Sequence, residues 1–459
     1  MRILLTNNTL AWRAGSELYI RDLALGLLRR GHCPVVFSSI LGPIAEELRQ
    51  ATVPVIDDLD ALNAPPDLIH GQHHLDAMVA ILRYPNVPAI YMCHGWSPWQ
   101  ERPPVFPSIR RYIAVDDLCR ERLLTTPGLA ADRIDVVLNG VDLGRFRPRP
   151  ALPGRATSAL IFNNYAWPTG YAETVARACK AQGIERVDIC GVRSGSSTTT
   201  PEALLAGYDV VFAKARCALE AMAVGCAVVV ADEAGLAGMV SSDNMRAWRR
   251  LNFGVRTMQA NASNDASISA ALEQYDAADA ALVSRFIRGD ASQEDVVDRL
   301  ISIYQAVLAE PPPLTSHKAE AEAASRYVTT LAEMLKGREH ADERAGIAEN
   351  SAANSMAAMK RSSEACAARH EELVMRAAAL EGENHLLRSS LDDALAQRAE
   401  IEFRSADEFA VAAAAAADNQ SLRVALDSAN SSVATLHEIE RSRAWRLIGM
   451  YRRVRRWLT

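Results

Sequence analysis

The sequence predicts an α/β protein with two parallel-sheet domains and an α-helical, possible coiled-coil tail. Short apolar runs alternate with helical patterns over residues 1–150 and again over 151–309. Strands that alternate with helices imply a parallel sheet with right-handed crossovers. From 310 to 459 the sequence becomes rich in Ala, Glu, Arg and Ser and contains almost no Gly. We therefore expect three parts: 1–150, 151–309 and 310–459.

In the first domain, buried parallel strands are expected where apolar runs are continuous, and helices where apolar residues recur every three or four positions. The expected strands are Arg2–Thr6, Cys33–Ser38, Asp67–Ile69, Val87–Met92, Arg111–Val115 and Ile134–Leu138, and the expected helices are Ser16–Arg30, Ile44–Arg49 and Asp117–Leu124. The proline-containing run 145–155 is typical of a linker.

The second domain repeats this pattern with fewer strands. Its expected strands are Ala159–Phe162, Arg186–Cys190, Asp209–Phe212 and Ala227–Ala231, and its expected helices are Glu173–Gln182, Leu219–Val224, Ile268–Tyr275, Ala277–Arg288 and Gln293–Ala309. In the extension, Leu373, Leu380 and Leu387 recur every seven residues. This favours a helical rod or weak coiled coil, interrupted at Gly382 and Asn384, with self-association through 365–400. The alternative is a solvated single helix or partial disorder.

Composition excludes several classes of protein. A formal net charge of −6 argues against a general nucleic-acid binder. The eight cysteines include no CxxC pair and no spacing typical of zinc, so we expect reduced structural thiols. The chain opens directly as a strand, and no apolar run approaches the roughly 20 residues that span a bilayer. We expect a cytoplasmic protein, with peripheral attachment to the inner membrane as a further possibility.

The segment 209–240 has the outline of a nucleotide site. A buried strand is followed by a short basic loop, Ala213–Cys217, and by a helix that carries Glu220. Ligands of doubly wound sheets bind at the carboxyl ends of the strands. A helix N-terminus beside Lys214 and Arg216 suits a phosphate, and an acid in the first turns suits the two ribose hydroxyls.

Six short motifs occur in order along residues 1–309. They are Ala14-Gly15-Ser16-Glu17, Asp67-Leu-Ile-His70, Val87–Gly95 (VPAIYMCHG), Ile113-Ala-Val-Asp116, Leu138-Asn-Gly-Val-Asp142 with Phe146-Arg-Pro148, and Glu220-Ala-Met-Ala-x-Gly225. In this order they resemble the motifs of GT-B glycosyltransferases, most closely retaining family four.

The resemblance implies two facing Rossmann-like domains, with the nucleotide mainly on the second and the acceptor mainly on the first. It implies that Gly15 and Ser16 approach the diphosphate or the transferring sugar. Glu220 would bind the ribose, and Asn139 and Gly140 would shape the hinge-side wall. The reaction implied is front-face substitution with retention, and the nucleotide-sugar is a substrate, so that no cofactor is expected.

Two departures concern the donor site. The family's first donor-site glutamate would fall eight residues before Glu220, where this chain has Phe212. The basic pair that follows the second domain's first strand in the family is absent from 162–170. A diphosphate without cations in a half-closed cleft is costly. We therefore expect Lys214, Arg216 or Arg193 to replace the missing phosphate ligands, with solvent-exposed loop charge as the alternative.

A third departure is the short segment between Gly191 and Asp209, which suggests that one βα unit is missing. The resemblance places His94 near the transferring sugar, and we assign catalytic roles to His94 and to Lys214. His70, His73 and His74 are expected to line the cleft or the core. No metal site is expected, because basic side chains and helix N-termini can carry the charge of the leaving diphosphate.

The C-terminal run 441–459 contains seven arginines and no acid. Leu447, Tyr451, Val454 and Leu458 fall on one helical face, and this pattern is typical of a helix that lies in an anionic membrane interface. A helix that packs on the enzyme is the alternative. The segment also resembles the endings of bacterial polysaccharide glycosyltransferases, and a membrane location suits a lipid-linked acceptor.

These expectations combine into a nucleotide-sugar-dependent glycosyltransferase, of hexosyltransferase type, that acts on a glycan or lipid-linked glycan acceptor. Its expected role is the synthesis of a bacterial surface polysaccharide such as lipopolysaccharide. The rival hypothesis is a non-catalytic GT-B-like scaffold subunit of a polysaccharide assembly complex. Transfer onto a protein or a small metabolite is a third alternative.

Overall fold

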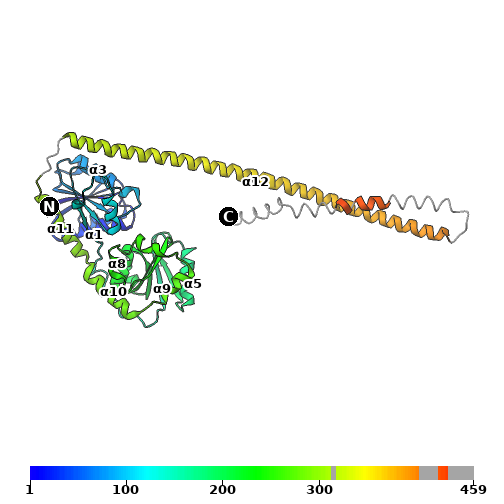
Figure 1. The fold of residues 1–459 in the computed structure, drawn as a ribbon, viewed down its shortest axis with the longest axis horizontal. Coiled ribbons are helices and arrows are strands. Elements are labelled where there is room, and N and C mark those ends of the chain that lie inside the picture. Colours follow the sequence, from blue (N-terminus) through cyan, green and yellow to red (C-terminus); the bar gives the residue numbers. More distant parts are fainter. Residues whose placement is uncertain (312–316, 403–421, 429, 433–459) are drawn as a thin grey trace. The chain divides into compact units, whose positions relative to one another are not determined.

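A computed structural model describes residues 1–311, 317–402, 422–428 and 430–432 (Figure 1). The chain divides into two compact units, and the first comprises Met1–Leu331. The second contains the described residues from Ala332 onward. The described residues form two sheets, both within the first unit, which confirms the predicted α/β class.

The first sheet is parallel throughout, in the order β3-β2-β1-β4-β5-β6-β7. Its strands are β1 (Arg2–Thr6), β2 (Cys33–Phe37), β3 (Val55–Ile56), β4 (Leu68–Gln72), β5 (Ala89–Cys93), β6 (Ile109–Ala114) and β7 (Ile134–Val136). The helices between them are α1 (Gly15–Arg29), α2 (Pro43–Gln50), η1 (Leu59–Ala61), α3 (His74–Arg83), η2 (Trp99–Glu101), α4 (Asp117–Leu124) and η3 (Ala131–Arg133).

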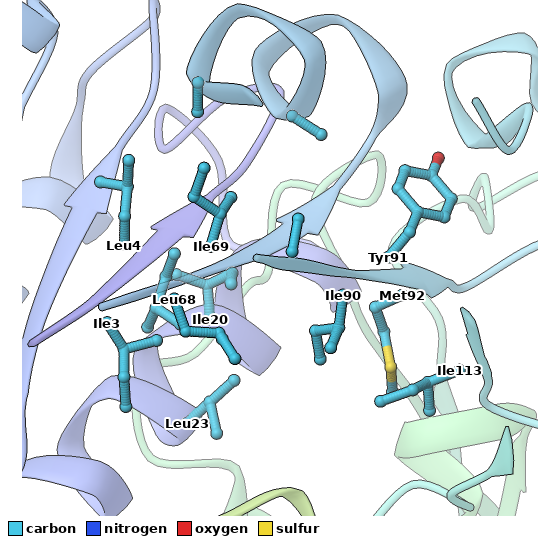
Figure 2. Close-up of a cluster of buried hydrophobic side chains, with 14 of the residues drawn as sticks. Ile3, Leu4, Ile20, Leu23, Leu68, Ile69, Ile90, Tyr91, Met92 and Ile113 are labelled. Carbon is cyan, nitrogen blue, oxygen red and sulfur yellow. The ribbon is translucent and has the colours of Figure 1, made fainter. Parts of the chain in front are cut away.

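The strands of this sheet carry apolar side chains on both faces. In Figure 2, Leu4 and Ile69 point to one face, whereas Ile3 and Leu68 point to the other, where Ile20 and Leu23 of α1 also lie. All six side chains are fully buried. Burial on both faces explains why these strands are continuous apolar runs in the sequence.

The second sheet has the order β12-β11-β10-β8-β9, with β12 antiparallel to β11. Its strands are β8 (Ser158–Phe162), β9 (Arg186–Cys190), β10 (Val210–Ala213), β11 (Ala227–Asp232) and β12 (Gly235–Met239). Its helices are α5 (Tyr171–Ala181), α6 (Pro201–Leu205), α7 (Ala215–Val224), α8 (Met245–Arg249), η4 (Val255–Ala260), α9 (Asp265–Leu272) and α10 (Ala277–Asp290). The short segment 191–209 forms α6 alone, so β9 becomes an edge strand, as expected if one βα unit is missing.

The helix α11 (Gln293–Ala309) follows the second sheet in the chain but packs on the first. Val297, Leu300 and Tyr304 are buried in the core that surrounds β1 and β4. The hydroxyl of Tyr304 lies 2.6 Å from Nδ1 of His70, which is fully buried. The chain therefore crosses back to the first domain here, while the division at residues 150 and 309 stays a prediction.

The extension forms α12 (His317–Glu402), one continuous helix in Figure 1. The predicted interruption at Gly382 and Asn384 is wrong, because strong helix formers on both sides carry the helix through them. Nδ2 of Asn384 donates to the backbone oxygen of Leu426, 3.4 Å away. Self-association through 365–400 stays a prediction. No helix among the described residues combines the length and apolar character needed to cross a membrane. The basic segment 441–459 lies outside the described residues.

Candidate functional site

The N-terminus of α1 leaves backbone donors without a side-chain cap. Ala14 occupies the N-cap position, and alanine has no oxygen to accept from the first turn. No atom lies within 4 Å of the position that a Cβ on Gly15 would occupy. The Ser16 hydroxyl donates to Oε2 of Glu17 over 2.9 Å, and burial raises the pKa of Glu17. Gly15 and Ser16 thus lie at an open helix N-terminus of the kind that binds anionic groups.

His94 immediately follows β5 and belongs to a polar network. Its Nε2 lies 2.6 Å from Oε1 of Gln72, and Nε2 of Gln72 donates to Oδ1 of Asn7, also over 2.6 Å. Because a carboxamide oxygen can only accept, His94 carries a proton on Nε2. Burial lowers the pKa of His94 to about 4. His94 is therefore neutral near neutral pH, with the ring held edge-on to Tyr19 at 4.6 Å.

The backbone amide of His94 donates to Oε2 of Glu101 over 3.0 Å. The other oxygen of that carboxylate lies 3.2 Å from Nε2 of His73. His70 is a core residue, and His74 contacts Tyr327. The neighbouring histidines thus have separate partners, and the described residues include no group of three or more His, Cys, Asp or Glu suited to a metal ion.

Arg216 lies inside α7 and joins the two domains. The expected basic loop 213–217 is wrong in extent, because α7 already begins at Ala215. Nη2 of Arg216 pairs with Oδ2 of Asp22 on α1, and Nε of Arg216 donates to Oε1 of Glu220 over 2.8 Å. Burial raises the pKa of Glu220, although the positive charge of Arg216 opposes this shift. The acid expected to bind ribose therefore already holds an arginine through one oxygen.

Lys214 is the N-cap residue of α7, and its ammonium group pairs with Oδ2 of Asp232. Asp232 ends β11, the neighbouring parallel strand, and its side chain is buried. The carboxyl ends of β10 and β11 thus bring these two groups together. A phosphate that binds Lys214 has to share this cation with a buried carboxylate.

Arg193 extends from the loop after β9 to the loop after β8. Its amide donates to the backbone oxygen of Asn164 over 3.1 Å. Its guanidinium lies 5.4 Å from the ring centres of both Tyr165 and Trp167, which are exposed. Within the described part of the chain, no carboxylate pairs with Arg193. It therefore lies against the loop 162–170, the segment that lacks the basic pair expected from the resemblance.

Asn139 and Gly140 lie where the two domains are connected. The backbone oxygen of Asn139 accepts from Nη2 of Arg249 over 2.9 Å. A Cβ on Gly140 would lie 2.8 Å from Cα of Gln293, at the start of α11. This contact requires glycine, and it is consistent with a hinge-side position for both residues.

The structure thus brings some predicted residues together and leaves others apart. Arg216 and Glu220 are in direct contact, whereas Lys214, Arg193 and His94 each have separate partners. Sequence reasoning missed Asp22, Asp232 and Glu101 and gave no role to Gln72, which follows the Asp67–His70 motif; these four residues hold the predicted residues in place. The sequence gives a weak indication of Asp232, because it is the first acid after the Val-rich run of the expected strand. It gives no indication of Asp22, which pairs with a residue 194 positions away.

Comparisons with known proteins agree with the predicted resemblance over the first domain. A family model described as Glycosyltransferase Family 4 matches residues 13–145. A comparison with curated proteins gives no match. Among solved structures, a glycosyltransferase from Rickettsia africae ESF-5 is 13% identical, with 68% of this chain and 99% of that chain covered and a TM-score of 0.48. Anabaena Alr3699/HepE in complex with UDP and glucose is 15% identical, with 67% and 100% covered and a TM-score of 0.47.

Proposed function

We propose that the protein is a glycosyltransferase of GT-B type that takes a nucleotide-sugar donor. The family match over residues 13–145 supports the acceptor-side domain. The second sheet, parallel apart from β12, supplies a Rossmann-like partner, and such sheets bind ligands at the carboxyl ends of their strands. Fold alone does not establish a reaction, so the proposal depends on the residues of the site.

The position of Arg193 carries the proposal. Lys214 and Arg216 are both paired with carboxylates, whereas Arg193 pairs with none among the described residues. Arg193 belongs to the loop after β9, and its guanidinium lies beside Tyr165 and Trp167 of the loop after β8. A guanidinium can bind a phosphate with two parallel hydrogen bonds. We assign the diphosphate of the donor to Arg193 and to the open N-terminus of α1. Lys214 and Arg216 then mainly stabilise the structure of the site through their ion pairs with Asp232, Asp22 and Glu220.

The remaining roles follow the family resemblance. Glu220 binds the ribose through the oxygen that Arg216 does not use, and His94 contacts the transferring sugar as a neutral ring. The donor phosphate accepts the acceptor's proton during front-face substitution with retention. We propose a hexosyl donor and a glycan or lipid-linked glycan acceptor, in the synthesis of a bacterial surface polysaccharide.

A non-catalytic scaffold is the second candidate, and the ion pairs around α7 favour it. Arg216 engages Glu220 and Asp22 at once, so that its own ion pairs join the two domains. Such a subunit would keep the GT-B shape and bind partners through its helical extension. The two candidates differ in whether the site binds a nucleoside diphosphate.

A melting-temperature panel separates them. Full-length protein is heated with UDP, GDP, dTDP, CDP or ADP, each at about 1 mM, and a ligand at ~100 times its dissociation constant stabilises by about 2.7 kcal/mol. The transferase predicts that one nucleotide raises the melting temperature of the wild type and raises that of Glu220→Gln much less. The absence of any shift with all five nucleotides supports the scaffold instead.

A further inference from the structure

A cavity of about 520 Å³ lies between the first domain and the first turns of α12. One wall comes from α12 and the other from loops that follow η2 and α4. Its lining includes Arg102, Val105, Pro127, Arg326, Tyr327 and Thr330. The volume is in the range of small-molecule sites, and every lining residue lies within the first compact unit.

The wall from α12 is anchored to the first domain. Ala323 is 2% exposed and belongs to the core around β1. The hydroxyl of Tyr327 donates to the backbone oxygen of His74 over 3.2 Å and lies 2.9 Å from Nδ1 of the same residue. The cavity is therefore a built feature of the unit rather than a chance gap beside a long helix.

The cavity carries unbalanced positive charge. Arg102 and Arg326 both line it, and its lining includes no acid. Within the described residues, neither guanidinium has a hydrogen-bond or ion-pair partner. Glu101, next to Arg102 in the sequence, pairs with His73, and Glu322, four residues before Arg326, pairs with Lys318. Burial lowers the pKa of His74 to about 4, so His74 is neutral near neutral pH and the two arginines set the charge.

The remainder of the lining is largely apolar. Pro103, Pro104, Pro127 and Leu331 line the cavity together with Val105. A fully hydrated anion gains nothing from such walls, whereas an apolar group is stabilised because its surface is removed from water. The two arginines and the apolar lining together therefore suit a ligand that has an anionic head group and an apolar part.

We propose that this cavity binds a phosphorylated amphiphile, with the phosphate on Arg102 and Arg326 and the apolar part against the prolines and Leu331. Two guanidinium groups match the charge of a phosphate monoester and can each donate two hydrogen bonds to it. The site lies outside the donor site and needs no sugar transfer, so it is independent of the proposed function.

Isothermal titration of the full-length protein tests this site. The probe is dihexanoyl phosphatidic acid below its micelle concentration, compared with inorganic phosphate and with uncharged dihexanoylglycerol. We expect one molecule of phosphatidic acid to bind, at least about tenfold more tightly than either comparison ligand. Inorganic phosphate that binds as tightly as the amphiphile would overturn the apolar part of the assignment.

Two variants and one matched control complete the test. Arg102→Gln with Arg326→Gln removes both charges, and Thr330→Phe fills the cavity while it keeps them. Each should weaken binding at least about tenfold. The control, Arg361→Gln with Arg388→Gln, removes two exposed charges from α12 outside the cavity lining and should leave affinity unchanged. Equal affinity in the wild type and both cavity variants, or no binding by the wild type, would overturn the proposal.

Discussion

Asp22 of α1 and Arg216 of α7 form an ion pair that joins the two α/β domains. Their side chains are 13% and 18% exposed, so the pair is largely removed from water. Burial acts to raise the pKa of Asp22, but the positive charges of Arg216 and Arg21 outweigh it and hold this pKa below its ordinary value. Arg216 thus connects the helix that begins at Gly15 with the helix that carries Glu220.

Replacing Asp22 by Asn should destabilise the first unit, because Arg216 then keeps only one carboxylate. Removal of one partner from a buried ion pair costs about 3–5 kcal/mol, and we expect the lower end because Arg216 keeps its second carboxylate, Glu220. Differential scanning calorimetry measures the change. Asp117→Asn is the matched control, since it breaks the exposed interdomain pair with Arg250 and should cost less than about 1 kcal/mol. Equal losses of unfolding free energy in the two variants would show that the Asp22–Arg216 pair stabilises the protein no more than the exposed pair does.

His94 should not gain a proton until the solution is acidic. Its pKa in the folded protein is about 4, against 6.5 ordinarily. The unfolded chain therefore binds more protons between these values, and the stability contributed by neutral His94 falls as pH drops from 6.5 towards about 4. Histidine ring signals in NMR spectra, assigned with His94→Gln, report this titration directly. A midpoint near 6.5 for His94 would contradict the buried network.

Two glycines should respond differently to the addition of a methyl group. Gly140→Ala places a Cβ 2.8 Å from Cα of Gln293, a backbone atom that cannot move aside, and overpacking of this kind costs about 1–3 kcal/mol. Gly15→Ala meets no atom within 4 Å and should leave the melting temperature unchanged. It should still weaken nucleotide binding, because the methyl group projects at the open N-terminus of α1. Unchanged nucleotide affinity in Gly15→Ala would show that the N-terminus of α1 does not take part in nucleotide binding.

Arg193 should contribute more to nucleotide binding than Lys214. Arg193→Gln removes a charge-assisted hydrogen bond worth about 1.5–3 kcal/mol, which is roughly a 10- to 100-fold loss of affinity. Lys214→Gln should have a smaller effect, since Asp232 already neutralises this side chain. Titration calorimetry with the nucleotide selected by the melting panel gives both values. A larger loss in Lys214→Gln would restore Lys214 as the main phosphate ligand.

Most strands were predictable because they are buried on both faces. Val228, Val229 and Val230 of β11 form a short apolar run of β-branched residues, and such residues favour a buried strand. In contrast, β12 has the sequence GLAGM, and its antiparallel pairing depends on β11 and on contacts formed only in the folded chain. Local patterns contain no information of that kind.

The candidate site was predictable in position but only partly in its contacts. Gly15, His94 and Glu220 were placed by motifs that mark the ends of strands and the starts of helices. The partners Asp22 and Gln72 come from distant segments, and no local pattern reports which charge a folded chain brings beside Arg216 or His94. For this reason the sequence led us to expect Arg216 in a basic loop, whereas the structure places it in a buried ion pair.

Consumption of a nucleotide-sugar tests the proposed function most directly. Full-length protein is incubated with UDP-, GDP-, dTDP-, CDP- and ADP-sugars and a bacterial lipid extract, and released nucleoside diphosphate is measured by mass spectrometry. The transferase predicts that the wild type consumes one donor class and that Glu220→Gln and Arg193→Gln consume it at least about tenfold more slowly. A nucleotide that stabilises the wild type, without consumption of any corresponding nucleotide-sugar, would contradict the proposed transferase.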